Sequence, residues 1–304
     1  MTAGARNLRT TEAVGAAIQR GLPLVALESS VLAQGLLPPH NRAAAERMVA
    51  AIEQRGVVPA ITAVVHGVAT LGLEPHELER FLKRDGVRKV SARDLAFAMT
   101  AGLDGATTVA GTLALCALGK IEVFATGGIG GVHRDAPYDE SADLAELART
   151  PAIVVCAGAK SILDLPATIE RLETLGVTVV GYRTRAMPGF FTTTTGIALD
   201  VTVQSVEEIA SLWSNHRVLR RPGALLVVQP PPSEFALEPE LVNEATTAAL
   251  RDAKEQGVRG GAVTPFLLAE VQKRTNGRSV VSNLALLEAN AALAADIATA
   301  IKNP

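Results

Sequence analysis

The sequence is poor in aromatic residues and has no excess of charge of either sign. Its 304 residues include one Trp, two Tyr and seven Phe, and 29 Lys+Arg stand against 31 Asp+Glu for a formal net charge of -2. The stacking surfaces and the basic field that bind nucleic acid or anionic lipid are therefore missing. We expect no nucleic acid and no membrane among its partners. Because 48% of the residues are hydrophobic, a large aliphatic core and a small-molecule substrate are expected.

Cysteine is almost absent too. Cys116 and Cys156 each lie in an apolar run, which favours buried free thiols over a disulfide framework. Neither has the Cys/His spacing of a structural zinc site. The first twenty residues lack the apolar stretch of a signal peptide, and no 18-residue uncharged segment occurs. We therefore expect a soluble cytoplasmic protein.

Short apolar runs alternate with amphipathic segments along most of the chain, which is typical of βα units around a parallel sheet. We predict an α/β fold, a three-layer α/β/α arrangement with a central mixed, mostly parallel sheet, and one domain over residues 1–304. The expected strands are Leu24–Leu27, Ile61–Val65, Arg88–Val90, Glu122–Thr126, Ile153–Cys156, Val177–Gly181, Leu199–Val203 and Ala224–Val228.

Helix signals punctuate the segments between these strands. Asn41 is expected to cap a helix that stops at Gly56, and Pro75 suits a first helical turn. Ser205 with Glu208 has the spacing of a capping box. Further helices are expected at Pro239 to Gly257, from Thr264-Pro265 onward, and over Ala289–Ile301.

Two residues that follow expected strands are candidates for chemistry. Glu28 comes directly after one apolar strand, and Lys160 follows Ile153–Cys156 among small and apolar neighbours. Ligands of parallel sheets collect beyond the carboxyl ends of strands. A desolvated lysine loses its proton and can act as a Schiff-base nucleophile. The structural alternatives are a solvated or capping glutamate and a lysine that extends into water.

The segment Thr126–Arg134 is rich in glycine and resembles a phosphate-binding loop. Glycines let backbone N–H groups approach anionic oxygens, and His133 and Arg134 add donors. Because neither the dinucleotide nor the nucleoside-triphosphate fingerprint fits, a sugar phosphate is the preferred ligand. A tight bend is the alternative interpretation.

Acidic residues crowd the next segment, Tyr138–Asp143. Carboxylate oxygens with room for water suit a hard divalent ion such as Mg²⁺ or Mn²⁺. The alternative is that Asp139 or Ser141 merely caps the helix expected at Ala142–Ala148.

Taken together, these stretches resemble the pseudouridine-5′-phosphate glycosidase family, also called the indigoidine synthase A-like family. The likeness runs from about Leu8 to Ile301. Its motifs are Ala26–Ser29, Lys89–Leu95, Gly105–Ala110, Phe124–Arg134, Ser141–Leu144, Val154–Leu165, Pro188 with Phe190–Phe191, and Thr264–Ala269. The resemblance implies cleavage of the C–C glycosidic bond of pseudouridine 5′-phosphate to uracil and ribose 5-phosphate, with Glu28 as proton donor and Lys160 as covalent nucleophile.

The same resemblance implies further site residues and partners. Asp139 is the expected ligand of Mn²⁺, and the family implies a homotrimer; a sugar kinase, fused in some relatives, would here be a separate protein. The expected substrate contacts are Lys89, Val109, Thr126, His133, Ser141, Ala142, Asp143 and Asn283. A Schiff-base aldolase or isomerase for another sugar phosphate, and a sugar-phosphate sensor, remain as alternatives.

Overall fold

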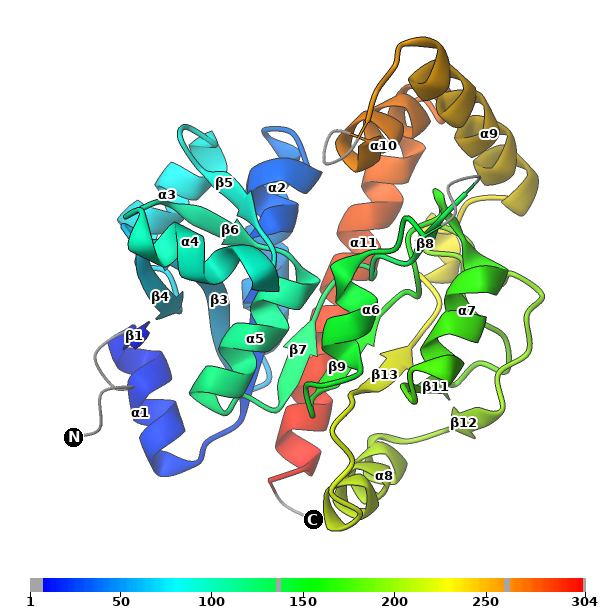
Figure 1. The fold of residues 1–304 in the computed structure, drawn as a ribbon. Coiled ribbons are helices and arrows are strands. Elements are labelled where there is room, and N and C mark those ends of the chain that lie inside the picture. Colours follow the sequence, from blue (N-terminus) through cyan, green and yellow to red (C-terminus); the bar gives the residue numbers. More distant parts are fainter. Residues whose placement is uncertain (1–7, 135–137, 260–262, 303–304) are drawn as a thin grey trace.

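The computed structural model describes residues 8–134, 138–259 and 263–302. A central sheet lies between helices on both of its faces (Figure 1). The sheet has 11 strands among the described residues, in the order β1-β4-β3-β2-β7-β9-β13-β11-β12, with β6 joined to β3 and β5 to β6. Its strands are β1 (Leu8–Thr10), β2 (Leu24–Glu28), β3 (Val58–Val65), β4 (Val68–Leu71), β5 (Arg88–Val90), β6 (Gly105–Thr107), β7 (Val123–Ala125), β9 (Ile153–Cys156), β11 (Thr178–Tyr182), β12 (Val201–Val203) and β13 (Leu225–Val228).

Antiparallel pairing is confined to β3 with β4 and β3 with β6 in this sheet, and the other pairs are parallel. A separate antiparallel pair joins β8 (Val132–His133) to β10 (Leu163–Asp164). The predicted fold class, a mixed and mostly parallel sheet between helical layers, is therefore confirmed.

The helices begin and end close to the sequence signals in most cases. They are α1 (Glu12–Arg20), α2 (His40–Glu53), α3 (Pro75–Lys83), α4 (Leu95–Thr100), α5 (Val109–Gly119), α6 (Ala142–Leu147), α7 (Leu165–Thr174), α8 (Val206–Val218), α9 (Pro239–Glu255), α10 (Val263–Arg274) and α11 (Arg278–Ala300), with short turns η2 (Val31–Gly35), η3 (Ala92–Asp94) and η4 (Ser233–Phe235). Ser205 caps α8 by accepting the N–H of Glu208, and Pro75 opens α3.

Three expectations need correction. Asn41 does not cap a helix but lies inside α2, where its Nδ2 donates to the carbonyls of Leu32 and Leu82 at 3.0 and 2.9 Å. The terminal helix begins at Arg278 rather than Ala289, because α11 is buried on most sides and lacks the one-sided apolar pattern that marks a surface helix. Strands β1, β4 and β6 of the large sheet and the separate pair β8 and β10 were not predicted. Strand β4 follows β3 through a two-residue turn in which His66 and Gly67 both have positive φ.

Helix α11 is the long central element of one helical layer. It runs behind β7 and β9 in Figure 1 and packs on α2 and α8. Its length and hydropathy alone would let it cross a membrane, but 72% of the apolar window is buried within the protein. It is therefore a core helix of this fold.

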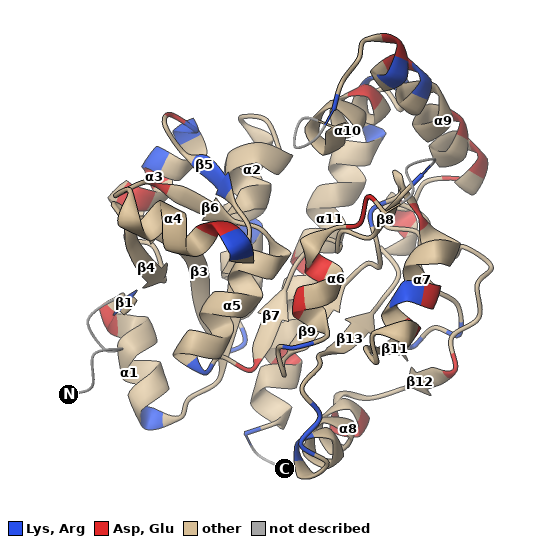
Figure 2. Ribbon diagram, viewed as in Figure 1, with Lys and Arg blue, Asp and Glu red and all other residues tan. Residues whose placement is uncertain are grey.

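Charged residues are spread over the outer helices and loops, with both signs interspersed in the view of Figure 2. The two thiols lie in the core as free cysteines. Burial raises the pKa of both Cys116 and Cys156 to about 12, so neither is a nucleophile at neutral pH.

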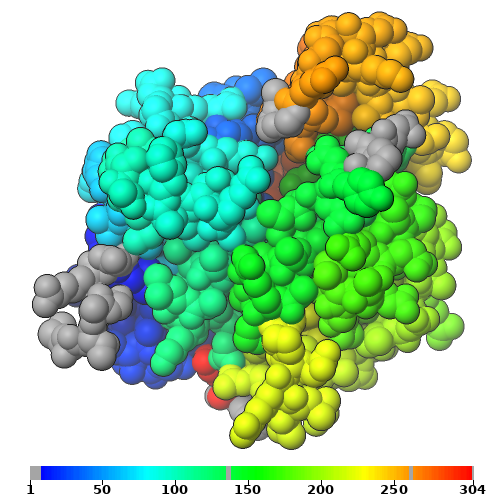
Figure 3. Space-filling model, viewed as in Figure 1, coloured from blue at the N-terminus to red at the C-terminus, as the bar shows by residue number. Residues whose placement is uncertain are grey.

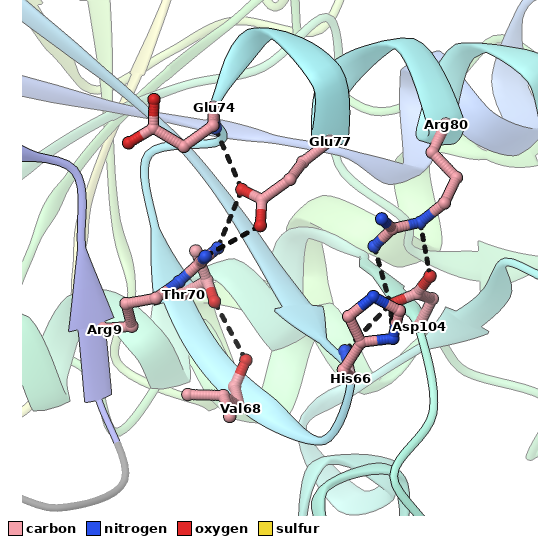
Figure 4. Close-up of polar contacts among 8 residues, drawn as sticks. All are labelled: Arg9, His66, Val68, Thr70, Glu74, Glu77, Arg80 and Asp104. Carbon is pink, nitrogen blue, oxygen red and sulfur yellow. Dashed lines mark hydrogen bonds and ion pairs between the residues drawn. The ribbon is translucent and has the colours of Figure 1, made fainter.

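A buried carboxylate ties the first strand to the sheet edge (Figure 4). Glu77 of α3 is 3% exposed and accepts two contacts of 2.7 Å from the guanidinium of Arg9 in β1. It also accepts the backbone N–H of Glu74 at 2.9 Å. A second carboxylate, that of Asp104, binds the same helix: Nε of Arg80 donates to it at 2.8 Å. Asp104 also accepts the N–H of His66, in the β3–β4 turn, at 2.8 Å. Glu77 thus ties strand β1 to α3, and Asp104 ties the β3–β4 turn to α3.

The Glu77 contacts predict an acid-sensitive contribution to stability. Burial alone would raise the pKa of Glu77, but the Arg9 and Glu74 hydrogen bonds outweigh burial and lower it. A lowered folded-state pKa stabilises the fold above the unfolded pKa, and this gain is lost as pH falls through the folded pKa. We expect Glu77→Gln to reduce the free energy of unfolding by about 1–3 kcal/mol at neutral pH, and by less in acid, where wild-type Glu77 is also protonated.

Urea unfolding of both proteins across pH measures this difference. The matched control is Glu79→Gln. Glu79 lies on α3, like Glu77, and its substitution removes an exposed ion pair with Arg42 of α2, which should have a much smaller effect. A pH-independent difference, or equal effects of the two variants, would contradict the prediction.

Candidate active site

The parallel strands β2, β7 and β9 lie in the centre of the sheet and bring three sequence-distant segments together at their carboxyl ends, the carboxyl edge of the sheet. Ala26 pairs with Phe124, and Phe124 pairs with Val154. Glu28 ends β2, and Thr126 follows β7 directly. Strand β7 lies between β2 and β9, so the strands that carry Glu28 and lead to Lys160 are next-nearest neighbours rather than adjacent.

The loops after β7 and β9 run side by side beyond this edge. The N–H of Ala157 donates to Gly127 O at 2.9 Å, the N–H of Ile129 to Gly158 O at 3.1 Å, and the N–H of Lys160 to Ile129 O at 3.1 Å. This backbone pairing brings Lys160 across β7, so that Glu28 and Lys160 line the same cavity.

The glycine loop itself is built for close packing. A Cβ on Gly130 would lie 2.2 Å from Ser141 Oγ, and one on Gly128 would lie 2.6 Å from the Phe190 ring. The N–H of Gly130 donates to Asp143, and that of Ile129 to the neighbouring loop. The expectation that this loop cradles a phosphate with its N–H groups is therefore wrong at these positions, because protein acceptors already occupy the donors. Arg134 is likewise engaged, donating to the carbonyls of Leu163 and Ser161.

The carboxylate of Asp143 accepts backbone N–H groups from two different segments. Its Oδ2 accepts the N–H of Gly130 at 2.8 Å, and its Oδ1 accepts the N–H of Ala110, in the first turn of α5, at 2.9 Å. The residue is 4% exposed and lies in the first turn of α6, which Ser141 caps. One carboxylate thus joins α5, α6 and the glycine loop at the wall of the cavity.

Glu28 is held by two hydroxyl groups. It is 6% exposed; Thr126 Oγ1 donates to Oε1 at 2.5 Å, and Ser30 Oγ donates to Oε2. A hydroxyl donates to a carboxylate or turns to accept from a carboxylic acid. Ser30 and Thr126 therefore fix the position of Glu28 in either protonation state. Thr126 lines the cavity, but its hydroxyl group is bound to Glu28.

The cavity has two parts that meet at Glu28, Ser30, Lys89, Lys160 and Thr264. Figure 3 shows a hollow where the cyan, green and orange segments converge. We call one part the polar lobe. Besides the shared residues, its lining includes Ser91, Arg93, Thr108, Val109, His133, Asp139, Glu140, Ser141, Ala142 and Asp143. All the sequence-predicted substrate contacts other than Thr126 and Asn283 lie here.

Lys89 of β5 projects into this lobe. The residue is exposed overall, but its ammonium nitrogen is partly buried. Burial of that nitrogen and the charge of Lys160 lower the pKa of Lys89, while Asp143 and Glu28 act in the opposite direction. Two amines and two carboxylates therefore influence one another at the junction of the lobes.

The other part, the apolar lobe, carries residues that the sequence did not single out. Its lining adds Val31, Gln34, Gly35, Thr126, Gly127, Gly128, Phe190, Pro265, Leu268 and Asn283 to the shared set. Phe190 belonged to a quoted motif without a role, and Gln34 sits in an apolar stretch that gives no signal of its own. Asn283 and Thr126, predicted as substrate contacts, are both found here.

Asp139 is the candidate metal ligand. Its side chain is 59% exposed, and its Oδ2 lies 2.8 Å from Nδ1 of His133, close in distance but not aligned as a hydrogen bond. The neighbouring Glu140 is paired with Arg171 at 2.9 Å. Among the described residues no cluster of three or more His, Cys, Asp or Glu side chains could enclose an ion. A single accessible carboxylate fits a hard divalent ion that keeps most of its waters. Residues 135–137, which precede this segment, lie outside the described residues.

A buried carboxylate and a lysine that line one cavity at the carboxyl ends of a mostly parallel sheet are typical of an α/β enzyme. Residues 13–300 match the family described as indigoidine synthase A like protein, and the chain belongs to that family. It is 65% identical over 293 residues to a pseudouridine-5′-phosphate glycosidase of Gemmatimonas aurantiaca, covering 96% of each chain. A glycosidase of the same name from Herpetosiphon aurantiacus is 48% identical over 95% of this chain and 96% of its own.

Solved structures share the fold. A prealnumycin C-glycosynthase in complex with ribulose 5-phosphate superposes with a TM-score of 0.90 at 33% identity, covering 97% of each chain. An indigoidine synthase A-like protein of Thermotoga maritima gives a TM-score of 0.89 at 33% identity, covering 97% of this chain and 96% of its own.

The bridging role of Asp143 predicts a specific loss of stability. In Asp143→Asn the amide keeps one acceptor oxygen, so the NH₂ group must face a backbone N–H of Ala110 or Gly130. We expect the free energy of unfolding to fall by about 1–3 kcal/mol, the cost of a buried unmatched polar group. Urea unfolding measures it, with Asp85→Asn, on an exposed side chain, as a control that should stay within about 0.5 kcal/mol of wild type. Equal stability of the two variants would refute the bridge.

Proposed function

We propose that this protein is a pseudouridine-5′-phosphate glycosidase, which cleaves the C–C glycosidic bond of its substrate with water to give uracil and ribose 5-phosphate. The observation that carries the proposal is that Glu28 and Lys160 line one cavity where a polar and an apolar lobe meet. The names of the relatives support the same substrate. The ribulose 5-phosphate complex of the C-glycosynthase supports a sugar phosphate as ligand.

The two lobes suit the two halves of this substrate. Lys89, Arg93 and His133 give the polar lobe cationic and hydrogen-bonding groups, and α5 begins there at Val109, so the ribose phosphate is placed in it. Phe190, Pro265 and Leu268 give the other lobe apolar walls, which suit a flat base. The bond to be cleaved then lies beside Glu28 and Lys160.

A lysine is needed because the leaving atom is carbon. Ordinary glycosidases protonate a heteroatom with a lone pair, whereas uracil C5 has none. In the proposed sequence the C1′–O4′ bond opens, with its electron pair going to O4′. Lys160 Nζ, as the free amine, bonds to C1′, and O4′ takes up the proton that the amine loses. The C1′–C5 bond then breaks as C5 takes a proton and the nitrogen lone pair forms an imine to C1′. Water hydrolyses the imine to ribose 5-phosphate and restores the lysine.

Glu28 is the proposed donor of the C5 proton. Its carboxyl group lies between two hydroxyls that serve either protonation state, so it can give up the proton without losing its partners. General acid catalysis typically raises a rate by about 10²–10⁴-fold, and we assign a contribution of this size to Glu28.

Mn²⁺ bound through Asp139 and water is part of the proposal. When bound, the ion supplies positive charge to the polar lobe, where phosphate and sugar oxygens lie. Nδ1 of His133 lies 2.8 Å from this carboxylate. We further propose a homotrimer that acts in the cytoplasm in pseudouridine catabolism.

Lys160 provides the sharpest test of the mechanism. Incubation of the purified protein and Mn²⁺ with pseudouridine 5′-phosphate should release uracil, measured by chromatography, and Lys160→Arg and Lys160→Ala should abolish release. Borohydride with ribose 5-phosphate should trap an adduct on wild type and on Glu28→Gln, but not on Lys160→Arg, because a guanidinium forms no imine under these conditions.

Lys83→Arg, on the exposed face of α3, is the matched control and should behave as wild type. Substantial uracil release by Lys160→Arg, or an adduct on a different lysine, would overturn the covalent mechanism. Sugar-phosphate turnover without uracil would instead favour a Schiff-base aldolase or isomerase.

Removal of the metal gives an independent test. A chelator should suppress uracil release, and Mn²⁺ should restore it. Asp139→Asn weakens an oxygen ligand, so we expect a higher Mn²⁺ concentration for half-activation, whereas Asp85→Asn should leave that concentration unchanged. Trapping of ribose 5-phosphate on Lys160 should persist in Asp139→Asn. Full activity after chelation would remove the metal from the proposal.

A further inference from the structure

We propose that Gln34 is a specificity-determining residue that accepts a ring N–H of the base, so that the enzyme selects bases with two free ring N–H groups. The inference rests on the proposed function and concerns the apolar lobe alone.

Gln34 reaches this lobe from the turn that follows β2. Residues Val31–Gly35 form a single π-helical turn, η2, which closes through the N–H of Leu36 and the carbonyl of Val31 at 2.9 Å. Such wide turns recur at functional sites. Here the turn starts three residues after Glu28 and carries Gln34 to the cavity wall.

The orientation of the Gln34 amide is set by its other partner. Its Nε2 donates to the carbonyl of Val87 at 3.2 Å, and a carbonyl needs a donor, so the NH₂ group must face Val87. The carbonyl oxygen Oε1 is then directed elsewhere. It is buried and has no hydrogen-bond partner in the protein.

Asn283 presents the same feature from another element. It lies in α11, is 8% exposed, and its Oδ1 is also buried without a partner. An unmatched buried acceptor costs about 1–3 kcal/mol. Two such acceptors in one apolar lobe indicate a ligand that brings donors. Both side chains line the apolar lobe, so donors on a ligand bound there would complete them.

Uracil joined to ribose through C5 offers such donors. Its edge opposite C5 presents N1–H, the C2 carbonyl and N3–H in that order. Gln34 Oε1 and Asn283 Oδ1 would accept the two N–H groups while the ring lies between apolar walls. A base joined through N1 has lost one of these donors, and neutral cytosine lacks a proton on N3. The apolar lobe therefore recognises the pattern of donors that distinguishes a C-linked uracil.

The test uses the reverse reaction, in which uracil and ribose 5-phosphate combine. We compare uracil with 1-methyluracil and 3-methyluracil in wild type and in Gln34→Met, which keeps the length of the side chain but has no acceptor oxygen. Wild type should discriminate against both methylated bases. Gln34→Met should raise KM for uracil about tenfold and should lose about tenfold of the discrimination against one methylated base, while KM for ribose 5-phosphate stays unchanged.

Two controls separate a specific effect from a loss of fold. Gln272→Met changes a glutamine of α10 that lines a neighbouring groove, which Gln34 and Asn283 also border, but not this lobe, and it should match wild type. Borohydride trapping of ribose 5-phosphate on Gln34→Met reports an intact Lys160.

The outcomes also separate this inference from the proposed function. An active wild type whose KM and discrimination are unchanged in Gln34→Met would overturn the role of Gln34 and leave the proposed function standing. A wild type that neither releases uracil from pseudouridine 5′-phosphate nor joins uracil to ribose 5-phosphate would overturn both.

Discussion

The alignment of three parallel strand ends is the constraint on which the site depends. Once Ala26, Phe124 and Val154 stand in one row of the sheet, the chain leaves β2, β7 and β9 at the same edge. Parallel strands bring chemistry-bearing loops together there regardless of their separation in sequence. The pairing of the loops beyond β7 and β9 extends this order by a few residues, and it positions Lys160 relative to Glu28 through backbone hydrogen bonds rather than side-chain contacts.

Close packing around this edge explains why the loop after β7 is so rich in glycine. At Gly130 the space of a side chain is filled by Ser141, and at Gly128 by the Phe190 ring. The loop N–H of Gly130 is committed to Asp143. A glycine-rich sequence that suggests phosphate binding serves here to let α6 and the segment around Phe190 approach the catalytic edge. The cationic side chains of the polar lobe, and not this N–H group, remain for the phosphate of the proposed substrate.

Hydrogen-bond partners divide the polar groups of the cavity into two kinds. Glu28 and Asp143 are fully engaged by hydroxyl or backbone donors, which fixes their positions. Gln34 and Asn283 each keep one buried oxygen without a partner. Groups that must be placed accurately are satisfied within the protein, whereas groups proposed to recognise the base are completed by it.

The sequence by itself determined the layered α/β fold, because alternation of apolar strands and amphipathic helices is a local pattern that leaves few other arrangements. It also singled out Glu28 and Lys160, since each follows a buried strand. It did not reveal strand β4, whose two-residue turn lacks the usual Asn-Gly signal, or the true start of α11, which is buried on most sides and shows no periodic face. The engagement of Asp143, the two hydroxyl partners of Glu28 and the place of Gln34 were decided only by the tertiary structure. Apart from the contact of Ser30 with Glu28, these features depend on contacts between residues more than ten positions apart, and a local sequence pattern carries no information about which distant donor a side chain will meet.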